Sequence, residues 1–430
     1  MTTRVLTGIT PSGTPHLGNY VGAIRPAIAA SQASEIESFF FLADLHSLIK
    51  AQEPERTQRS TLEIAASWLA CGLDPDKVWF YRQSDIPETT ELMWFLTVIA
   101  SKGILNRAHA YKAAVDKNRE EQLDEDAGIS AGLFMYPVLM AADILIFKAN
   151  RVPVGRDQIQ HIEMARDFAQ RFNHVYGKAY FPLPEVVIDE QVATLAGLDG
   201  RKMSKSYDNV IGLFAPREQV RKQIFSIVTD SRAPGEPKDT EGSALFQIYQ
   251  AFASEEQTET LRQAYAEGIS WSDAKQVLFE HIDAEIAPMR HKYEHLVSHP
   301  QELEDILQAG AAKARTRATP LMKELREAVG LRNLAARSGG KKAKAAKASL
   351  PSFKQYREAD GKFYFKFVDA AGKVLLQSKA FASPKEAGQL IARLREQPES
   401  AAAEPMLEPL DPSSAAEVSL ALQHLTQSQN

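Results

Sequence analysis

The chain has 430 residues, a formal net charge of −5 at pH 7 and a hydrophobic fraction of 44%. This length is enough for two or three domains with a sizeable core, and the small net charge excludes wholesale electrostatic binding to nucleic acid, so any contact with RNA must be local. The single cysteine, Cys71, excludes an intrachain disulfide and a cysteine-based zinc site.

The sequence contains neither a membrane span nor a signal peptide. Its most apolar stretch, residues 132–147, includes Pro137 and Asp143 and is only 16 residues long, whereas a spanning helix needs about 20. The N-terminal MTTRVLTGIT lacks the long apolar core and cleavage site of a secretory leader. We therefore expect a cytoplasmic protein that does not contact membranes.

The N-terminal segment has the pattern of a strand, a turn and a helix. Residues 3–9 form an apolar run rich in β-branched side chains, which predicts a buried strand. A glycine-containing turn over residues 11–15 follows, and helical spacing over 17–29 places His16 and Asn19 at a helix N-terminus. Such a terminus suits phosphate. This unit opens a doubly wound parallel sheet, in which ligands bind at the carboxyl ends of strands.

Tyr136, Met140 and Asp143 lie at helical spacings of four and three residues. One helix face would therefore present a phenol, a thioether and a carboxylate. The alternative is that Tyr136 and Met140 are core residues and that Asp143 is a buried cap or a member of an ion pair.

A second motif, KMSKS, occupies residues 202–206 and follows Gly197 and Gly200. Its two lysines, Lys202 and Lys205, could fold over a triphosphate and neutralise the charge that grows on a departing pyrophosphate. Phosphoryl-type transfer needs mainly positioning and electrostatics, so the lack of a nucleophile–base constellation is expected. The alternative interpretations are a solvated surface loop here and a capped helix start at the first motif.

Roughly the first 334 residues resemble bacterial tryptophanyl-tRNA synthetases, class I aminoacyl-tRNA synthetases whose signature motifs are called HIGH and KMSKS. The matching stretches occur in the family order and spacing and are TGITPSGTPHLGNYVGA (7–23), MYPVLMAADIL (135–145), VPVGRDQIQHIEMARDFAQRFN (152–173) and GRKMSKSYDN (200–209). The resemblance implies a homodimeric tryptophan–tRNA ligase that acts on L-tryptophan, ATP and tRNA(Trp). It also implies Mg²⁺ as the cofactor, held mainly by the ATP phosphates rather than by a protein metal site.

The resemblance also assigns site residues. Those implied in catalysis are His16, Asn19, Lys112, Lys202 and Lys205. Those implied in ATP binding are Thr10, Pro11, Ser12, Gly18, Asn19, Gly155, Asp157, Lys202, Met203, Ser204 and Lys205. Those implied in tryptophan binding are Leu6, Gly8, His46, Tyr136, Met140, Asp143 and Gln158.

Two alternative functions can be distinguished from tryptophan–tRNA ligation by particular residues. Tyrosyl enzymes share the chemistry but typically carry glutamine where Met140 stands, and a polarizable sulfur suits an indole face. In the resembled family the Asp143 carboxylate would accept the indole N–H. The other rival, a regulatory or RNA-binding paralogue, has no need of the intact lysines and histidine of both motifs.

Three features depart from the family pattern. Thr10 stands where many bacterial members have glutamine, and Arg156 stands where an acidic residue is common. Residues 116–128 form a longer, acidic segment, which we interpret as a solvated loop, with a lid over the site as the alternative.

The expected fold is α/β, with a doubly wound, Rossmann-like catalytic domain, an α-helical anticodon domain and a small α+β appendage. In the helical part, the basic stretches 217–222 and 313–317 are candidates for contact with tRNA or solvated helix faces. The predicted divisions are a catalytic domain (1–212), a helical anticodon-binding domain (213–334), a basic linker (335–352), a strand–strand–helix domain of unknown function (353–397) and a disordered acidic tail (398–430).

Overall fold

The computed structural model divides the chain into two compact units, Met1–Arg332 and Asn333–Asn430. It describes residues 2–11, 13–50, 52–187, 194–331, 351–358, 360–369, 373–409 and 412–427. Over these ranges no helix combines the length and the apolar character that crossing a membrane would require.

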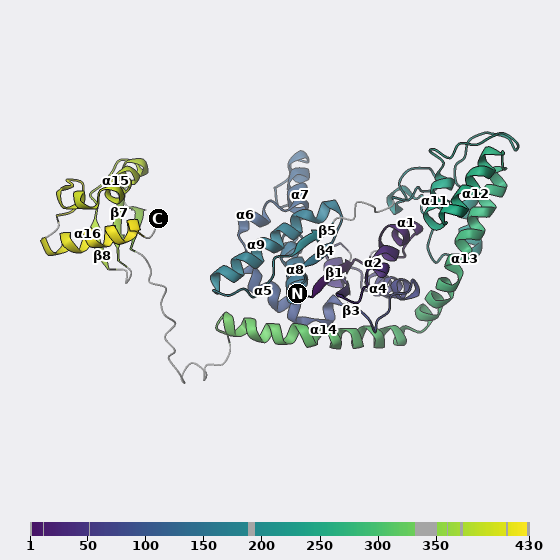
Figure 1. The fold of residues 1–430 in the computed structure, drawn as a ribbon, viewed down its shortest axis with the longest axis horizontal. Coiled ribbons are helices and arrows are strands. Elements are labelled where there is room, and N and C mark those ends of the chain that lie inside the picture. Colours follow the sequence, from purple (N-terminus) through teal and green to yellow (C-terminus); the bar gives the residue numbers. More distant parts are fainter. Residues whose placement is uncertain are drawn as a thin grey trace. The chain divides into compact units, whose positions relative to one another are not determined.

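A five-stranded parallel sheet lies at the centre of the first unit (Figure 1). In spatial order it contains β3 (Trp79–Arg82), β2 (Ile36–Leu42), β1 (Thr3–Ile9), β4 (Arg151–Pro153) and β5 (Glu185–Val187). β1 pairs in parallel with β2 on one side and with β4 on the other, so the winding direction of the chain reverses between β1 and β4. Doubly wound sheets bind ligands at this reversal point. The predicted first strand and fold class are confirmed.

Helices cover both faces of this sheet. Side chains on successive strand residues point to opposite faces, and in β2 the pair Phe40 and Leu42 enters one apolar core whereas Phe39 and Phe41 enter the other. The first core includes side chains from the helix α4 (Pro54–Ala70), and the second includes side chains from α5 (Pro87–Thr97), α8 (Ala131–Ile146) and α9 (Ile159–Val175).

Short elements connect the sheet to these helices. The predicted helix over 17–29 is interrupted, because α1 (Leu17–Asn19) continues into a π-helical turn (Tyr20–Ile24) before α2 (Arg25–Ala30). α3 (Asp44–Ser47) follows β2, and α6 (Lys102–Leu105) and α7 (His109–Glu120) precede α8.

The region predicted to be helical contains α10 (Arg217–Phe225), α11 (Ala244–Phe252), α12 (Glu255–Ala266), α13 (Trp271–Ser298) and α14 (Pro300–Ala328). α14 returns to the sheet and lies along its β3 edge (Figure 1). The predicted division at residue 213 therefore does not separate two compact units.

Basic residues 313–317 of α14 serve this packing. The Lys313 ammonium donates to the carbonyl oxygens of Asp76 and Val78, each at 2.9 Å. Arg315 pairs with Glu88 at 3.1 Å and Arg317 with Glu37 at 2.7 Å. The interpretation of this stretch as a merely solvated face is wrong, because its charges help to hold α14 on the catalytic core, whereas its contact with tRNA stays a prediction.

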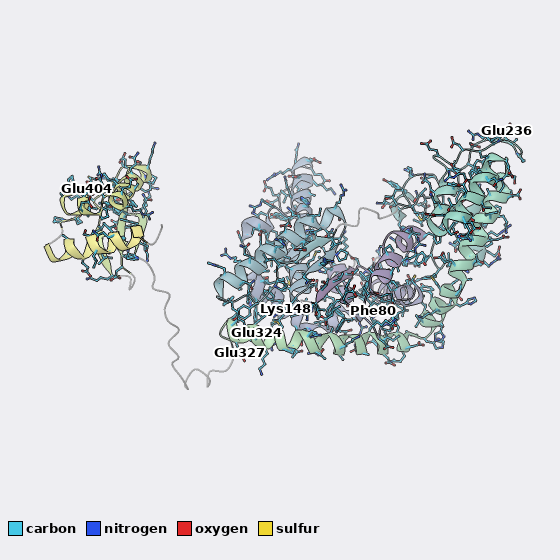
Figure 2. All side chains as sticks on the ribbon, viewed as in Figure 1. Phe80, Lys148, Glu236, Glu324, Glu327 and Glu404 are labelled. Atoms are coloured by element: carbon cyan, nitrogen blue, oxygen red, sulfur yellow. The ribbon has the colours of Figure 1, made fainter. Side chains whose placement is uncertain are left out.

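α14 approaches β3 so closely that only glycine fits at the contact. A Cβ atom at Gly310 would lie 1.7 Å from the carbonyl oxygen of Phe80, which is labelled in Figure 2. Gly310→Ala is expected to lower the free energy of unfolding by about 1–3 kcal/mol, because the helix must move away from the strand. Urea denaturation measures this loss.

Gly132 in α8 provides the matched control. A Cβ atom there meets only ordinary contacts, at 3.6 Å from Ser130 Oγ and 3.8 Å from Ile49 Cγ1. Gly132→Ala should leave stability unchanged or raise it by up to about 1 kcal/mol through helix propensity. Equal stability of Gly310→Ala and the parent would contradict the packing argument.

The second unit contains a three-stranded antiparallel sheet in the order β6 (Ser352–Arg357), β7 (Phe363–Val368), β8 (Val374–Gln377). β6 adds a third strand to the predicted pair. α15 (Pro384–Glu396), a 3-10 helix (Pro398–Ala403) and α16 (Pro412–Gln427) follow (Figure 1). Of the predicted linker 335–352, only residues 351 and 352 lie within the described ranges.

The prediction of a disordered tail over 398–430 is wrong for the residues that the structure describes. Val418 and Leu422 of α16 are completely buried in one core with Phe365 and Leu376. They are four residues apart and therefore share a helix face. The surrounding alanine, serine and acidic residues concealed this short apolar stripe from a judgement based on composition.

Candidate active site

A pocket of about 570 Å³ lies where the winding of the first sheet reverses. Leu6, Gly8 and Thr10 line it from β1 and the residue after it, and residues 152–154 line it from β4 and its end. The seven side chains predicted to bind tryptophan all line this one pocket: Leu6, Gly8, His46, Tyr136, Met140, Asp143 and Gln158.

Asp143 is the buried charge of the pocket. Its side chain is only 3% exposed. Gln83 Nε2 donates to its two carboxylate oxygens at 2.8 and 2.9 Å, and His46 Nε2 lies 2.9 Å from Oδ2. Burial raises the pKa of Asp143, and the contacts with His46 and Gln83 oppose that rise. Because a carboxylate offers about four acceptor sites, one remains for a donor in the pocket.

A second polar chain runs along the wall formed by α8 and α9. The Tyr136 hydroxyl lies 2.7 Å from His161 Nε2, and His161 Nδ1 lies 2.9 Å from Gln158 Oε1. The Gln158 amide in turn donates from Nε2 to Asp157 Oδ2 at 2.7 Å. Burial lowers the pKa of His161, which favours the neutral ring.

These contacts fix which atom donates and which accepts in each of the three hydrogen bonds. Asp157 accepts from the Gln158 amide nitrogen, so the Gln158 oxygen must face His161 and accept from its Nδ1–H. A neutral imidazole has only one N–H, so Nε2 accepts the Tyr136 hydroxyl proton. The lone pairs of the Tyr136 oxygen therefore remain available to a donor in the pocket.

The two sequence motifs lie side by side beyond the end of β1. The Leu17 amide donates to the Ile211 carbonyl and the Leu213 amide to the Pro15 carbonyl, each at 3.0 Å. A Cβ atom at Gly18 would lie 3.5 Å from Met203 Cβ, and one at Gly13 would lie 3.5 Å from Lys205 Nζ. The KMSKS segment therefore lies in van der Waals contact with the first turn, in which Gly13 adopts the positive φ of 89° that favours glycine.

Asn209 organises the KMSKS loop from within. Its Oδ1 accepts from the Ser204 amide at 2.8 Å, and its Nδ2 donates to the Lys202 carbonyl at 3.1 Å and to Asp199 Oδ1 at 2.6 Å. Met203 is buried, whereas Lys202 is exposed. One buried amide therefore sets the positions of the first and third residues of the motif.

His16 caps the helix that starts the first motif. Its Nδ1 accepts from the Asn19 amide at 3.3 Å, and Asn19 Oδ1 accepts from the His16 amide at 3.1 Å, which forms a capping box. Burial, and secondly the charge of Lys205, lower the pKa of His16 from 6.5 to about 4. His16 is therefore neutral at pH 7, and because Nδ1 accepts from Asn19, its single N–H is on Nε2 and can donate one hydrogen bond.

This lowered pKa predicts a pH-dependent stability. Between pH 6.5 and about 4 the folded chain binds fewer protons at His16 than the unfolded chain does. The contribution of the neutral His16 ring to the free energy of unfolding is complete above pH 6.5 and is lost as the pH falls through the folded pKa. His16→Asn keeps a capping acceptor but does not titrate, so its free energy of unfolding should fall by about 1–2 kcal/mol less than the parent's between pH 7.5 and 5. Parallel pH profiles would contradict this.

The remaining predicted nucleotide residues are spread around the pocket. Thr10 and Pro11 line it, whereas Gly155 and Asp157 lie at its edge in and before the turn Arg156–Gln158. A Cβ atom at Gly155 would lie 2.7 Å from Asp157 Oδ1, so a larger residue there would displace the Asp157 carboxylate. Arg156 is exposed. Ser12 lies outside the described residues.

Lys112 does not line the pocket. It is exposed on α7 and borders a separate hollow with Arg107, Tyr111 and Asp116. Two basic residues that the sequence reasoning did not select, Lys50 and Arg56, line the pocket instead. Arg56 lies in the first turn of α4.

The acidic segment 116–128 is not a loop throughout. Its first five residues complete α7, and the buried Asn118 side chain donates to the carbonyl oxygens of Glu125 and Ala127, both at 2.9 Å. Arg119 pairs with Glu125 at 2.8 Å. These contacts fold the segment back on α7, and none of its residues lines the pocket. The interpretation as a solvated loop is wrong for the helical half.

Comparisons with known proteins all indicate the same family. The family model described as tRNA synthetases class I (W and Y) matches residues 1–286. A tryptophan–tRNA ligase of Xanthomonas campestris is 75% identical over 394 residues, which is 91% of each chain. One from Pseudomonas aeruginosa is 61% identical over 92% of this chain and 89% of its own.

A solved structure shares the fold of the first unit. The tryptophanyl-tRNA synthetase of Campylobacter jejuni, complexed with ADP and tryptophan, is 43% identical with a TM-score of 0.71. The match covers 76% of this chain and 100% of the Campylobacter chain.

Proposed function

The chain belongs to the class I tRNA synthetases for tryptophan and tyrosine and acts as a tryptophan–tRNA ligase, and we propose that it performs this reaction in the pocket between β1 and β4. The tryptophan carboxylate attacks the α-phosphate of ATP, which gives tryptophanyl-adenylate and pyrophosphate. The terminal ribose hydroxyl of tRNA(Trp) then takes the aminoacyl group, and AMP leaves. We assign the cytoplasm as the site of this reaction.

The observation that carries the proposal is a buried carboxylate with one acceptor site unused. Asp143 is held from behind by Gln83 and His46. An indole N–H entering the pocket would complete its hydrogen bonds, and Met140 would lie against the ring. A smaller apolar amino acid would leave the carboxylate unpaired, which supports selection without an editing domain.

Tyr136 and Gln158 are proposed to hold the substrate's ammonium group. The Tyr136 hydroxyl donates to His161 and the Gln158 amide donates to Asp157, so each side chain keeps an oxygen lone pair for a donor. An ammonium group is a donor only. The directed chain therefore favours an amino group over a hydroxyl at this place and orients the carboxylate toward the nucleotide.

The nucleotide is proposed to lie across the first motif and the KMSKS loop. His16 and Asn19 would bind the α-phosphate region, Gly155 and Asp157 the ribose, and Lys202 and Lys205 the pyrophosphate. Thr10, Pro11, Ser12, Gly18, Met203 and Ser204 complete this proposed ATP site. Lys112, which lies on α7 outside the pocket lining, would add a contact to the phosphates.

Mg²⁺ is proposed to enter with ATP as part of the substrate. Within the described ranges no cluster of three or more histidine, cysteine or acidic side chains could hold a metal ion. This donor set fits an ion that the phosphate oxygens carry, since Mg²⁺ commonly binds through substrate phosphates and water.

We also propose a homodimer that buries the exposed apolar face of α5. Trp94 and Val98 are 65% and 61% exposed and lie four residues apart on one helix face. Trp94→Glu should therefore convert a dimer to a monomer, because a charge would be buried at the two-fold contact. Light scattering coupled to size exclusion measures the mass.

Val228 supplies the control for this prediction. It is 68% exposed and lies away from α5, after α10. Val228→Glu should remain dimeric. A parent chain that is monomeric at micromolar concentration, or a Trp94→Glu chain that is still a dimer, would refute the proposed interface.

Charging of tRNA tests the proposed reaction. With ATP and labelled tryptophan, the full chain should aminoacylate a tRNA(Trp) transcript and leave a tRNA(Tyr) transcript uncharged. Preferential attachment of tyrosine to tRNA(Tyr) would show that the pocket assignment is wrong.

A further inference from the structure

The sheet of the second unit has two chemically different faces. Phe365 and Phe367 of β7 are buried in a core with Leu390 and Leu394 of α15. Since successive strand residues point to opposite faces, Tyr364 and Lys366 must lie on the other face. With Lys354 and Tyr356 of β6 they form what we call the tyrosine–lysine face, and all four side chains are at least partly exposed.

The pairing of β6 with β7 sorts these four side chains into two rows. Tyr356 is directly opposite Tyr364, and Lys354 is directly opposite Lys366. The two phenol rings stack, with centroids 5.8 Å apart and an angle of 20° between their planes. Lys366 Nζ lies 5.6 Å from the centre of the Tyr356 ring. The face therefore combines flat aromatic surface with adjacent positive charge.

The row of lysines is unfavourable in the protein alone. Like charges directly opposite each other on a sheet destabilise the strand pair. Two other bases of this unit are ion-paired, since Lys373 pairs with Glu417 and Arg393 pairs with Glu404. In the part of the unit that the structure describes, neither Lys354 nor Lys366 forms an ion pair.

The neighbouring acid does not neutralise the lysine row. Asp360 accepts from the Tyr364 hydroxyl at 2.7 Å and from the Lys362 amide at 2.9 Å, in the turn beyond the tyrosine end of the face. It thereby fixes the Tyr364 ring, and Glu358 also lies close to both phenols. In the described part of the unit neither acid forms an ion pair with Lys354 or Lys366. An external anion would relieve the repulsion between the two ammonium groups.

We propose that the tyrosine–lysine face binds single-stranded RNA. Unpaired bases stack on aromatic side chains regardless of sequence, and lysines contact the phosphates between them. An anionic membrane or protein would match the lysines but would not require two stacked rings beside them.

Binding of a short oligoribonucleotide to the full chain tests the proposal. The probe is a fluorescein-labelled oligouridylate of about twelve nucleotides, within the site size of small single-strand binding domains. Fluorescence anisotropy should show that the double variant Tyr356→Leu, Tyr364→Leu binds at least about tenfold more weakly, since stacking on each ring is lost. Tyr356→Phe with Tyr364→Phe keeps the rings and should bind like the parent.

The contribution of the lysine row can be measured separately from the salt dependence of binding. Lys354→Glu with Lys366→Glu should weaken binding and reduce the slope of log affinity against log salt by about 1.4, which corresponds to two lost phosphate contacts. Lys385→Glu, on α15 against the opposite face, is the charge control and should change the affinity less than either double variant.

Tryptophan-dependent pyrophosphate exchange should be unchanged in all these variants, so a failure of this proposal is distinguishable from a failure of the proposed function. Oligouridylate affinity that is unaffected by the leucine pair would overturn the proposal, because the RNA would then bind elsewhere in the chain. Binding to phosphatidylserine vesicles without binding to oligouridylate would also overturn it.

Discussion

Asp143→Ala is expected to lower kcat/KM for tryptophan activation by roughly 30- to 1000-fold, which corresponds to about 2–4 kcal/mol. The native carboxylate is buried and receives hydrogen bonds from His46 and Gln83. Alanine would remove the acceptor for the indole N–H and leave both of those buried donors without their partner. Steady-state pyrophosphate exchange at varied tryptophan concentrations measures the effect.

Two comparisons separate recognition from general damage to the pocket. A tryptophan analogue with sulfur in place of the indole N–H cannot donate to Asp143, so the parent and Asp143→Ala should activate it at similar rates. Asp143→Asn keeps the shape of the side chain and should lie between the two. If Asp143→Ala activates the analogue and tryptophan with the same loss of rate, Asp143 supports the fold of the pocket and does not recognise the indole nitrogen.

Lys205→Ala is expected to slow adenylate formation by roughly 100-fold or more while tryptophan binding stays nearly intact. Lys205 lies beside Gly13 of the first motif, and burial lowers the pKa of its ammonium group. Charge on the pyrophosphate grows as the bond to the α-phosphorus breaks, so a nearby ammonium group stabilises the transition state more than the ground state.

Single-turnover kinetics with saturating ATP measure this effect, and equilibrium dialysis measures tryptophan binding. Lys323→Ala removes an exposed lysine of α14 and should leave both unchanged. If Lys205→Ala forms the adenylate at a normal rate but binds tryptophan more weakly, Lys205 acts on tryptophan and not on the pyrophosphate, which would contradict this role.

The local parts of the site could be predicted from the sequence because short-range patterns carry them. The apolar run 3–9, the glycine turn after it and the spacing of Tyr136, Met140 and Asp143 each reflect a single strand, turn or helix. The structure brings those three helix residues and the end of β1 to one pocket. The resemblance to a family added the grouping of residues that are far apart in the sequence.

The supporting residues could not be predicted in the same way because tertiary pairing creates their roles. Gln83 reaches Asp143 only because β3 pairs with β2. Nothing near Gln83 in the sequence indicates that its side chain is buried. His161 has the spacing of an ordinary residue on the buried face of α9. Its position three residues after Gln158 was the one available signal.

Composition misled the sequence reasoning in two segments. The acidic residues of 116–128 suggested a solvated loop, yet its first five residues belong to α7 and the Asn118 contacts hold residues 125 and 127 against that helix. The alanine- and serine-rich C-terminus suggested disorder, yet two aliphatic residues on one face suffice to bind α16 to the second unit. In both cases a few specific contacts outweigh the average character of the segment.

The central claim, that this pocket selects tryptophan, is tested most directly by amino-acid-dependent exchange of pyrophosphate into ATP, measured with the full chain and each of the twenty amino acids in turn. The acceptor on Asp143, the sulfur of Met140 and the directed Tyr136–His161–Gln158 chain predict strong exchange with tryptophan and only weak exchange with the other amino acids, tyrosine included. Exchange that is faster with tyrosine, or equal for several aromatic amino acids, would contradict the claim.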